Sequence, residues 1–524
     1  MQKLYFNGNI LTMEEGGSPQ AVLTENGRIK AVGDYSLLSS ISESALRVDL
    51  AGKTLLPAFI DAHSHLSACA SSFLQVPLEE CTSFNEIADR IRQFVETNHI
   101  PAGQWITAKG YDHNYLAEGR HPDLPLLDSC APENPLILQH ASGHVGVFNS
   151  KALELLGVSH DTPSPAGGLI GRQNGRLTGY MEEKAFFTYS QMAPMPDASA
   201  LLGAYMKAQD SYASYGISTV QEGMAVSQMI ALYNTLIGQN MLLDVVAYAD
   251  IKDFDAFSQA FPNSKKQYSG HFRLGGYKIF LDGSPQGRTA WMETPYADDP
   301  NYFGYGTMSD EQVLSAFRLS ADRQEQILAH CNGDAAAAQY IRAAEAVSQT
   351  ADIASLRPVI IHAQLLSREQ LPEVKRLGLI PSFFVAHVYH WGDIHIKNFG
   401  LERASEISPA ASALASGILF TFHQDSPVIA PNMLETVWCA VNRITKSGVT
   451  LGAEEKISVY EALKAVTINA AYQYFEEGSK GSIAVGKNAD FVILEQNPLT
   501  VPPMEIRNIN LLETIKNDVS IYKK

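Results

Sequence analysis

Short apolar runs alternate with segments of helical periodicity over most of the chain. Runs of this length that are apolar throughout are typical of buried strands. Their alternation with helices implies parallel strands joined by crossover helices. Eight such runs predict an α/β fold with a (β/α)8, TIM-like barrel. The runs are residues 55–60, 217–221, 243–247, 274–281, 327–330, 359–362, 380–385 and 418–422.

Helical periodicity is clearest in the second half of the chain. Ser309 and Gln312 have the spacing of a capping box, and Asp310 and Glu311 place acidic residues at a helix start. Helices are therefore predicted at residues 309–323, 335–348, 367–377 and 459–474.

Both ends of the chain have a different pattern, with short apolar runs between tight turns. Asn7-Gly8 and Asn26-Gly27 each separate two such runs, which is a strong hairpin signal. Residues 480–524 have the same character. Because chain ends often lie close together, residues 1–53 and 480–524 predict one small β-sandwich lobe beside a barrel domain of residues 54–479.

The interval between the first two barrel runs is too long for one crossover, so a long insertion is predicted at residues 67–200. It contains a helical pattern at 84–97 and a strand-like run at 135–141. A glycine-rich stretch at 167–179 lacks the Gly-Lys-Ser/Thr ending of a phosphate loop and predicts a β-hairpin. Long insertions of this kind usually shape a substrate pocket.

Composition narrows the classes of partner. The formal net charge of −17 argues against nucleic acid or an anionic membrane, so we expect a small-molecule substrate. Five scattered cysteines without a C-x-x-C pair indicate reduced thiols in a cytoplasmic protein. The first eight residues do not resemble a signal peptide, and no apolar run reaches the roughly 18 residues of a membrane span. We also expect a homo-oligomer, namely a dimer.

The first barrel run is followed by residues of the types that bind metals in proteins. Asp61, His63 and His65 follow it at a spacing of two, so in an extended backbone their side chains share one face. Neutral imidazole is a common ligand for zinc and similar ions. The pattern predicts a metal site rather than one core histidine and one surface histidine.

Other barrel runs also end in ligand-type residues. His330 and His362 each close an apolar run, and either alone could be a structural histidine. Together with His63 and His65 they form a set at the carboxyl ends of different strands, where the reactive groups of such barrels sit. This coincidence favours a metal site over core packing. Lys278 and Asp425, with His423 two residues before it, belong to the same set of strand ends.

The chain resembles the amidohydrolase superfamily, which comprises metal-dependent hydrolases on a (β/α)8 barrel with a β-sandwich lobe. The matching motifs span nearly the whole chain, and the closest likeness is to the branch that includes N-substituted formamide deformylases. The general motifs are residues 56–65, 330–335, 361–364, 423–427, 463–471 and 481–490, and the branch motifs are residues 143–153 and 278–284.

The resemblance implies a role for each strand-end residue. His63, His65, His330 and His362 match the family's metal ligands. Asp425 matches a carboxylate that binds metal and takes a proton from the attacking water. Zinc or another divalent ion, one or two per chain, would lower the pKa of bound water to about 7 and polarise the scissile carbonyl.

Lys278 matches a lysine that several branches carboxylate, so that its carbamate bridges two metals. A protonated ammonium cannot ligate a metal, so the implied role depends on that modification. Three alternatives stay open: an ordinary lysine paired with Asp282 or another acid, a bridging carboxylate at Glu183 or Glu222, or a single metal ion.

Substrate contacts are predicted at His144, Tyr111, Arg288 and His387. His144 lies in a branch motif of the insertion, and its alternative role is a hydrogen bond to the adjacent loop. His387 follows the seventh run and so faces the same end of the barrel. By contrast, polar surroundings predict that His121, His160, His271 and His395 are solvated.

These observations predict a metal-dependent hydrolase that cuts a non-peptide carbon–nitrogen bond, either an amide or an N-formyl group, with Asp425 as general acid and base. A deaminase or a lactone or ester hydrolase on the same site is the alternative among enzymes. A non-catalytic, metal-binding regulatory protein is the alternative from another class. The complete ligand set argues against it, because a degenerate scaffold has no need to keep every ligand.

Overall fold

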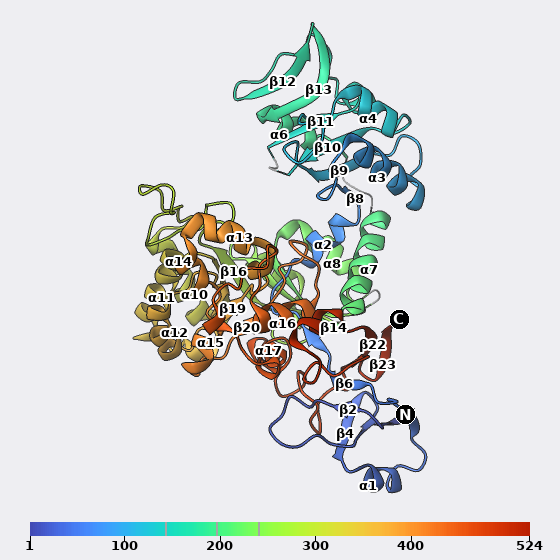
Figure 1. Ribbon diagram of the computed structural model, residues 1–524, viewed down its shortest axis with the longest axis vertical. Helices are drawn as coiled ribbons and strands as arrows, with labels where there is room; N and C mark the ends of the chain where they lie inside the picture. Colours follow the sequence, from blue (N-terminus) through green and yellow to red (C-terminus); the bar gives the residue numbers. More distant parts are fainter. Residues whose placement is uncertain (142–143, 195–197, 239–240) are drawn as a thin grey trace. The chain divides into compact units, whose positions relative to one another are not determined.

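The computed structural model describes residues 1–141, 144–194, 198–238 and 241–524. They form two compact units (Figure 1). The first unit comprises Met1–Ser67 and Ala208–Lys524 and carries the largest sheet together with both chain ends. The second unit is Ala68–Lys207, which lies between the first two strands of that sheet in the sequence.

Eight parallel strands form the largest sheet of the first unit. Their order in the sheet follows their order in the chain, so each crossover leads to the neighbouring strand. The predicted α/β class is confirmed, and the arrangement is consistent with a TIM-like barrel. The strands are β7 (Phe59–Ile60), β14 (Ile217–Ala225), β15 (Asp244–Asp250), β16 (Phe272–Phe280), β17 (Gln326–Cys331), β18 (Val359–His362), β19 (Ile380–Phe383) and β20 (Thr421–Phe422).

Backbone hydrogen bonds connect the two edge strands of this sheet beyond their ends. The amide of His65 donates to the carbonyl of Ser426 at 2.9 Å, and the amide of Asp425 donates to the carbonyl of His63 at 3.3 Å. No ladder between β7 and β20 is formed by the part of the chain that the structure describes. The segments after the first and last strands therefore run next to each other.

The expectation of one barrel strand over residues 55–60 is wrong. The run is divided between β6 (Thr54–Pro57), which pairs with a strand of the lobe, and β7 in the eight-stranded sheet. Between them, the Ala58 amide donates to the Asp490 carbonyl and the Phe59 amide to the Gly216 carbonyl. The residues of β6 and of β7 are both buried, so the apolar pattern does not indicate where the chain passes from one sheet to the other.

Both chain ends contribute to a lobe of two sheets. One sheet has the order β4-β3-β1-β5 and the other β2-β6-β21-β22-β23. A shared core that includes Tyr5, Leu55 and Phe491 lies between them. The strands are β1 (Gln2–Phe6), β2 (Asn9–Ile10), β3 (Ala21–Glu25), β4 (Arg28–Gly33), β5 (Leu46–Asp49), β21 (Phe491–Leu494), β22 (Leu511–Lys516) and β23 (Val519–Lys523), with helix α1 (Tyr35–Ser40).

Crossover helices flank the eight-stranded sheet, and α10, α11 and α12 lie side by side in Figure 1. The predicted capping box is present, since Ser309 accepts from the Gln312 amide and the Gln312 side chain accepts from the Ser309 amide. The helices are α2 (Leu66–Ser72), α7 (Ala198–Ser214), α8 (Ile230–Leu236), α9 (Phe254–Ala260), α10 (Asp310–Arg323), α11 (Asp334–Ser348), α12 (Leu371–Leu377), α13 (His387–Phe399), α14 (Leu401–Ser405), α15 (Ala410–Ala415) and α16 (Met433–Asn442).

The helix predicted at 459–474 is interrupted. It forms α17 (Val459–Ala465) and α18 (Ile468–Gln473), with Thr467 outside helical geometry. The carbonyl of Val466 accepts from the Ile60 amide at 2.9 Å, so a group that a continuous helix would use internally instead holds the end of β7.

The second unit has one mixed sheet, with the order β12-β13-β11-β10-β9-β8. The helix predicted at 84–97 forms there, and the glycine-rich stretch is the predicted hairpin of β12 and β13. The strands are β8 (Gln75–Pro77), β9 (Ile106–Tyr111), β10 (Leu136–His140), β11 (Val145–Phe148), β12 (Gly168–Gln173) and β13 (Arg176–Glu183), and the helices are α3 (Phe84–Thr97), α4 (Leu124–Cys130), α5 (Ser150–Leu155) and α6 (Lys184–Gln191).

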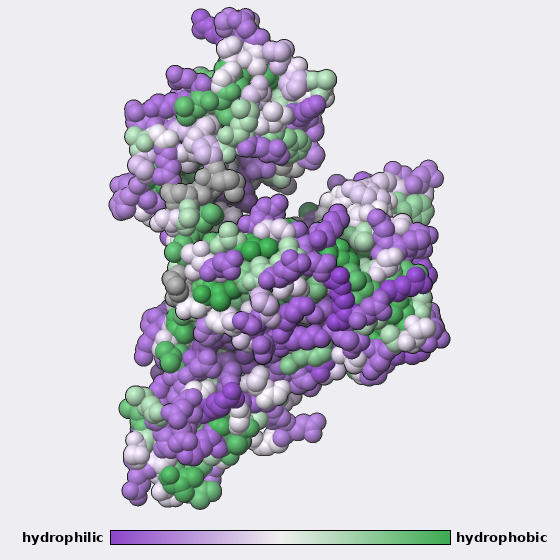
Figure 2. Space-filling model, turned by 180° about the vertical axis from the view of Figure 1, so that it is seen from behind, coloured by the Kyte–Doolittle hydropathy of each residue, from purple (hydrophilic) through white to green (hydrophobic). Residues whose placement is uncertain are grey.

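Hydrophilic residues predominate on the face drawn in Figure 2, with hydrophobic residues lying among them. Within the described residues, no helix has the length and apolar character needed to cross a membrane.

Candidate metal centre

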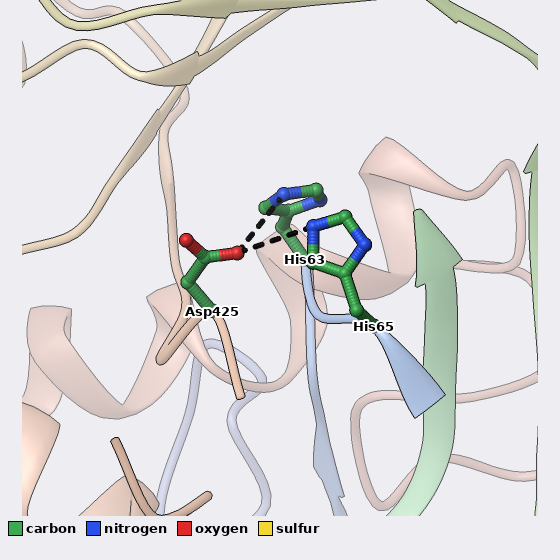
Figure 3. A group of neighbouring side chains, drawn as sticks. All are labelled: His63, His65 and Asp425. Carbon is green, nitrogen blue, oxygen red and sulfur yellow. Dashed lines mark ion pairs between the residues drawn. The ribbon is translucent and has the colours of Figure 1, made fainter. Parts of the chain in front are cut away.

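Three side chains that follow the two edge strands of the eight-stranded sheet converge on one point (Figure 3). His63 and His65 follow β7, and Asp425 follows β20. Asp425 Oδ1 lies 3.3 Å from Nε2 of His63 and 3.5 Å from Nε2 of His65. Ligands about 2.0–2.1 Å from a tetrahedral zinc ion lie about 3.3–3.4 Å apart. The separations therefore fit donors that share one ion.

Asp425 offers a carboxylate oxygen that is poised to bind a cation. Its side chain is 14% exposed, and no residue in the described part of the chain donates a hydrogen bond to the buried Oδ1 atom. A buried, unsatisfied carboxylate oxygen is unfavourable by itself, whereas a cation between it and the two imidazoles would satisfy it. This orphaned atom shows that the donor set fits a divalent metal.

His330 and His362 join the same cluster from β17 and β18. The Nδ1 atom of His330 lies 3.0 Å from Nε2 of His362, and that Nε2 lies 3.9 Å from Asp425 Oδ2. The rings of His63 and His362 are 5.6 Å apart. The four histidines and the aspartate, which are remote in the sequence, are thus brought together; their role as ligands stays a prediction.

Lys278 reaches the cluster from β16. Its Nζ atom lies 2.9 Å from His63 Nε2, and the side chain is buried. Burial lowers the pKa of Lys278 to about 8, so that the neutral amine becomes accessible near neutral pH.

The alternative pairing of Lys278 with Asp282 is wrong. The Asp282 carboxylate accepts three backbone hydrogen bonds instead, from Trp291 at 3.0 Å, Asn332 at 2.9 Å and Gly333 at 2.7 Å. Asp282 therefore anchors the loop after β16 to the loop after β17.

The two alternative bridging carboxylates are engaged elsewhere. Glu222 Oε2 accepts from the Ser67 amide at 2.8 Å and from the Tyr233 hydroxyl at 2.6 Å. Glu183 belongs to the second unit, where it lies 3.2 Å from Nδ1 of His144. These contacts give both carboxylates structural partners.

Contacts with surrounding residues set which ring nitrogen of His63 and of His330 faces the centre. The side-chain nitrogen of Gln221 donates to the Ala62 carbonyl and to the Tyr474 hydroxyl. Its Oε1 atom therefore accepts the Nδ1 proton of His63, which leaves Nε2 of the neutral ring without a proton. Nε2 of His330 lies 3.2 Å from the Gly283 carbonyl and 3.0 Å from the side-chain nitrogen of Asn332, and these contacts turn Nδ1 toward His362. Such partners are typical of metal-binding histidines.

His423 is a member of the cluster that sequence analysis did not predict as a site residue. Its Nε2 atom lies 3.2 Å from Nδ1 of His362, and its Nδ1 atom lies 3.0 Å from the Ser382 hydroxyl. The side chain is fully buried. Its spacing of two from Asp425 was the available signal, because that spacing places both on one face of an extended segment.

Burial keeps these imidazoles neutral, which is the form that binds metal. It lowers the pKa of His65 and of His330 to about 3. It also lowers the pKa values of His63, His362 and His423 well below their usual range, and neighbouring cationic groups add to the effect.

Two predicted substrate contacts lie in the first unit. Arg288 forms two contacts with Asp298, at 3.0 and 2.8 Å, which hold its guanidinium within its own loop. His387 is buried at the start of α13, where its Nδ1 atom lies 3.1 Å from Nε2 of His395. The expectation that His395 is solvated is wrong, because α13 buries it completely.

The other two predicted contacts lie in the second unit. Tyr111 is buried, and its hydroxyl lies 3.0 Å from Nδ1 of His121. His121 is half-buried and its ring stacks on another histidine, so it is only partly solvated. His144 is exposed and contacts Glu183 at the end of β13; Gly143 of the same motif is outside the described residues.

Residues 47–522 match the protein family described as the Amidohydrolase family. This chain belongs to that family. The predicted resemblance is therefore confirmed over most of the length of this amidohydrolase.

Known proteins similar to this amidohydrolase align over most of their own lengths. N-substituted formamide deformylase of Arthrobacter pascens is 26% identical over 544 residues, covering 99% of this chain and 98% of the relative. Protein LONG AFTER FAR-RED 3 of Arabidopsis thaliana is 29% identical over 512 residues, covering 94% and 87%. The crystal structure of an uncharacterized metal-dependent hydrolase from Pyrococcus furiosus matches with a TM-score of 0.79 at 25% identity, covering 95% and 100%.

Proposed function

We propose that this amidohydrolase is a metal-dependent hydrolase that cuts a non-peptide carbon–nitrogen bond, an amide or an N-formyl group, in a small molecule. The observation that carries the proposal is the convergence of His63, His65 and His362 on Asp425 at the strand ends, with His330 beside His362. The likeness to N-substituted formamide deformylase over nearly the whole chain supports the choice of bond.

His63, His65, His330, His362 and Asp425 would hold the metal. A bound zinc or similar divalent ion supplies a water with a pKa near 7 and polarises a carbonyl. Asp425 acts as the general base: while Oδ1 faces the metal, the second carboxylate oxygen, Oδ2, can accept a proton from the attacking water. The same carboxyl group then donates that proton to the nitrogen that leaves as an amine.

Lys278 extends the donor set if it carries a carbamate. In that reaction the neutral amine attacks the carbon of carbon dioxide and releases a proton, so that a neutral side chain becomes an anion. The buried position of Lys278 beside His63 supports this step, because burial favours the neutral amine that attacks carbon dioxide and places the carbamate among the histidines that would hold the metal.

A His63→Asn variant tests the proposal. We expect the purified variant to lose bound metal, and with it the hydrolysis of a panel of N-substituted formamides, which release amine and formate, and of acyl amides, which release amine and the corresponding carboxylic acid. His160→Asn is the matched control, because that side chain is 73% exposed and outside the cluster. Undiminished metal content and turnover in His63→Asn would refute the proposal.

The same assay separates the alternative activities. A deaminase would release ammonia from an aromatic or heterocyclic amine, and an ester or lactone hydrolase would release acid without amine. Metal content that depends on His63, without turnover of any of these substrates, would favour the non-catalytic alternative.

A further inference from the structure

A second group of metal-ligating side chains lies wholly within the unit Ala68–Lys207 and shares no residue with the candidate centre. It forms where the parallel strands β9 and β10 end next to each other. The Ala141 amide donates to the Tyr111 carbonyl at 2.8 Å, and His140 pairs with Tyr111 in the ladder. Asp112 and His113, which follow β9, are thereby placed beside His140 at the end of β10.

Three donor atoms of this group face one another at separations suited to one ion. Nδ1 of His113 lies 3.1 Å from Nε2 of His140, which lies 3.4 Å from Oδ1 of Asp112. The third separation, from His113 Nδ1 to Asp112 Oδ1, is 3.7 Å. These values lie close to the separation of about 3.3–3.4 Å between ligands of a tetrahedral zinc ion.

Neighbouring groups orient the donors as outer partners do in metal sites. Asp112 Oδ1 accepts from the amide and from the side chain of Asn114, at 2.9 and 2.8 Å. The His121 ring stacks on that of His113, with centroids 4.1 Å apart, and its Nδ1 atom lies 3.0 Å from the Tyr111 hydroxyl. The side chains of Asp112 and His113 are thus held by contacts with surrounding residues.

We propose that Asp112, His113 and His140 form a divalent-metal site in this unit. Two imidazole nitrogens and one carboxylate oxygen suit zinc, cobalt or nickel better than calcium or magnesium, which prefer oxygen ligands. Asp112 and His113 are about one-third exposed and His140 is 9% exposed, so solvent reaches one side of the site. Three protein ligands leave a coordination position open to water or another donor.

Metal stoichiometry of the full-length protein tests this site. We would strip the chain with a chelator, titrate it with Zn²⁺ and count bound ions in wild type and in His113→Asn/His140→Asn. We expect the double variant to bind one ion fewer per chain, and His160→Asn, whose histidine is exposed in the same unit, to match wild type. An equal count in wild type and in the folded double variant would overturn the site.

Two further measurements keep the test independent of folding and of the proposed function. Asp112→Asn preserves the shape of the side chain and should weaken Zn²⁺ binding at this site without unfolding the unit. Anomalous scattering at the zinc edge from wild-type crystals should give a peak between the three donors, and its absence at saturating Zn²⁺ would contradict the proposal. His63→Asn should leave this peak unchanged, so failure at one centre is distinguishable from failure at the other.

Discussion

Nζ of Lys278 lies 2.9 Å from Nε2 of His63, and both side chains are buried. An ammonium in this position would be buried away from solvent, and this burial lowers its pKa to about 8 although the charge of Asp425 favours the ammonium. A carbamate would place an anion where the neighbouring imidazoles converge. The contact therefore marks the position at which a modified lysine would join the metal ligands.

The first prediction concerns the modification itself. Protein prepared with ¹³C-bicarbonate should show a carbamate carbon resonance in its NMR spectrum, and Lys278→Ala should lose both that resonance and most of the turnover. A short carboxylate such as acetate should restore part of the activity, since it can occupy the vacated space. Lys252→Ala, at an exposed lysine, is the control. A resonance that persists in Lys278→Ala would contradict the assignment.

The second prediction concerns Asp425. Asp425→Asn keeps the size of the side chain but removes its ability to take a proton, so kcat should fall about 10²- to 10⁴-fold. Asp161→Asn, at an 82% exposed carboxylate, should leave kcat unchanged. Steady-state kinetics with an N-substituted formamide would measure the effect, and full activity of Asp425→Asn would exclude the role of proton acceptor.

The candidate centre could be predicted from the sequence because parallel strands end at one edge of their sheet. An apolar run that closes on His330, and another that closes on His362, must bring those histidines together if the strands are neighbours. No side-chain contact has to be known for this inference. It depends only on strand order, which the alternation of strands and helices implies.

Features set by tertiary packing could not be predicted in this way. His395 has polar neighbours in the sequence, yet α13 buries it against His387. From the sequence, Asp282 could equally have paired with Lys278, but its carboxylate instead accepts hydrogen bonds from three backbone amides. The division of residues 55–60 between two sheets has no signal in the apolar pattern, because the residues in both sheets are buried.

The third prediction concerns His423, which we expect to position His362 rather than to bind metal. Its hydrogen bond to Nδ1 of His362, supported by Ser382, fixes the ring whose Nε2 atom faces Asp425. Loss of such an outer partner typically weakens metal binding about 10- to 100-fold. His423→Gln should therefore raise the metal Kd by that factor in a competition with a chelator.

Two further variants separate positioning by His423 from a general effect of burial. Ser382→Ala should weaken metal binding in the same direction but less, because it removes only the support of the His423 ring. His395→Gln replaces an equally buried histidine whose ring contacts His387 on the same helix, and it should leave the metal Kd unchanged. Equal Kd values in His423→Gln and wild type would refute the positioning role.

The fourth prediction concerns the ionic group that joins β15 to the lobe. Asp244 lies 2.7 Å from Lys516 Nζ and is also bonded to Lys480, and all three side chains are buried. Burial alone would raise the pKa of Asp244, but the charge of Lys480, with His271 and Lys516, outweighs it and holds the pKa below its usual range. Asp244→Asn removes the carboxylate partner of the buried Lys516 ammonium, whereas Lys480 keeps its ion pair with Glu476 at 3.1 Å, so the variant should destabilise the fold by about 3–5 kcal/mol.

The sign of the pH dependence follows from the lowered pKa of Asp244. Its stabilising contribution is complete above the unfolded-state pKa of about 4 and is lost as the pH falls from there towards the folded-state value. Urea unfolding at several pH values should therefore show a large difference between wild type and Asp244→Asn at pH 7 that narrows below about pH 4. Asp89→Asn, at an exposed carboxylate paired with Arg92, should show no measurable difference at either pH. A difference that stays constant down to pH 3 would mean that Asp244 acts through packing rather than through its charge.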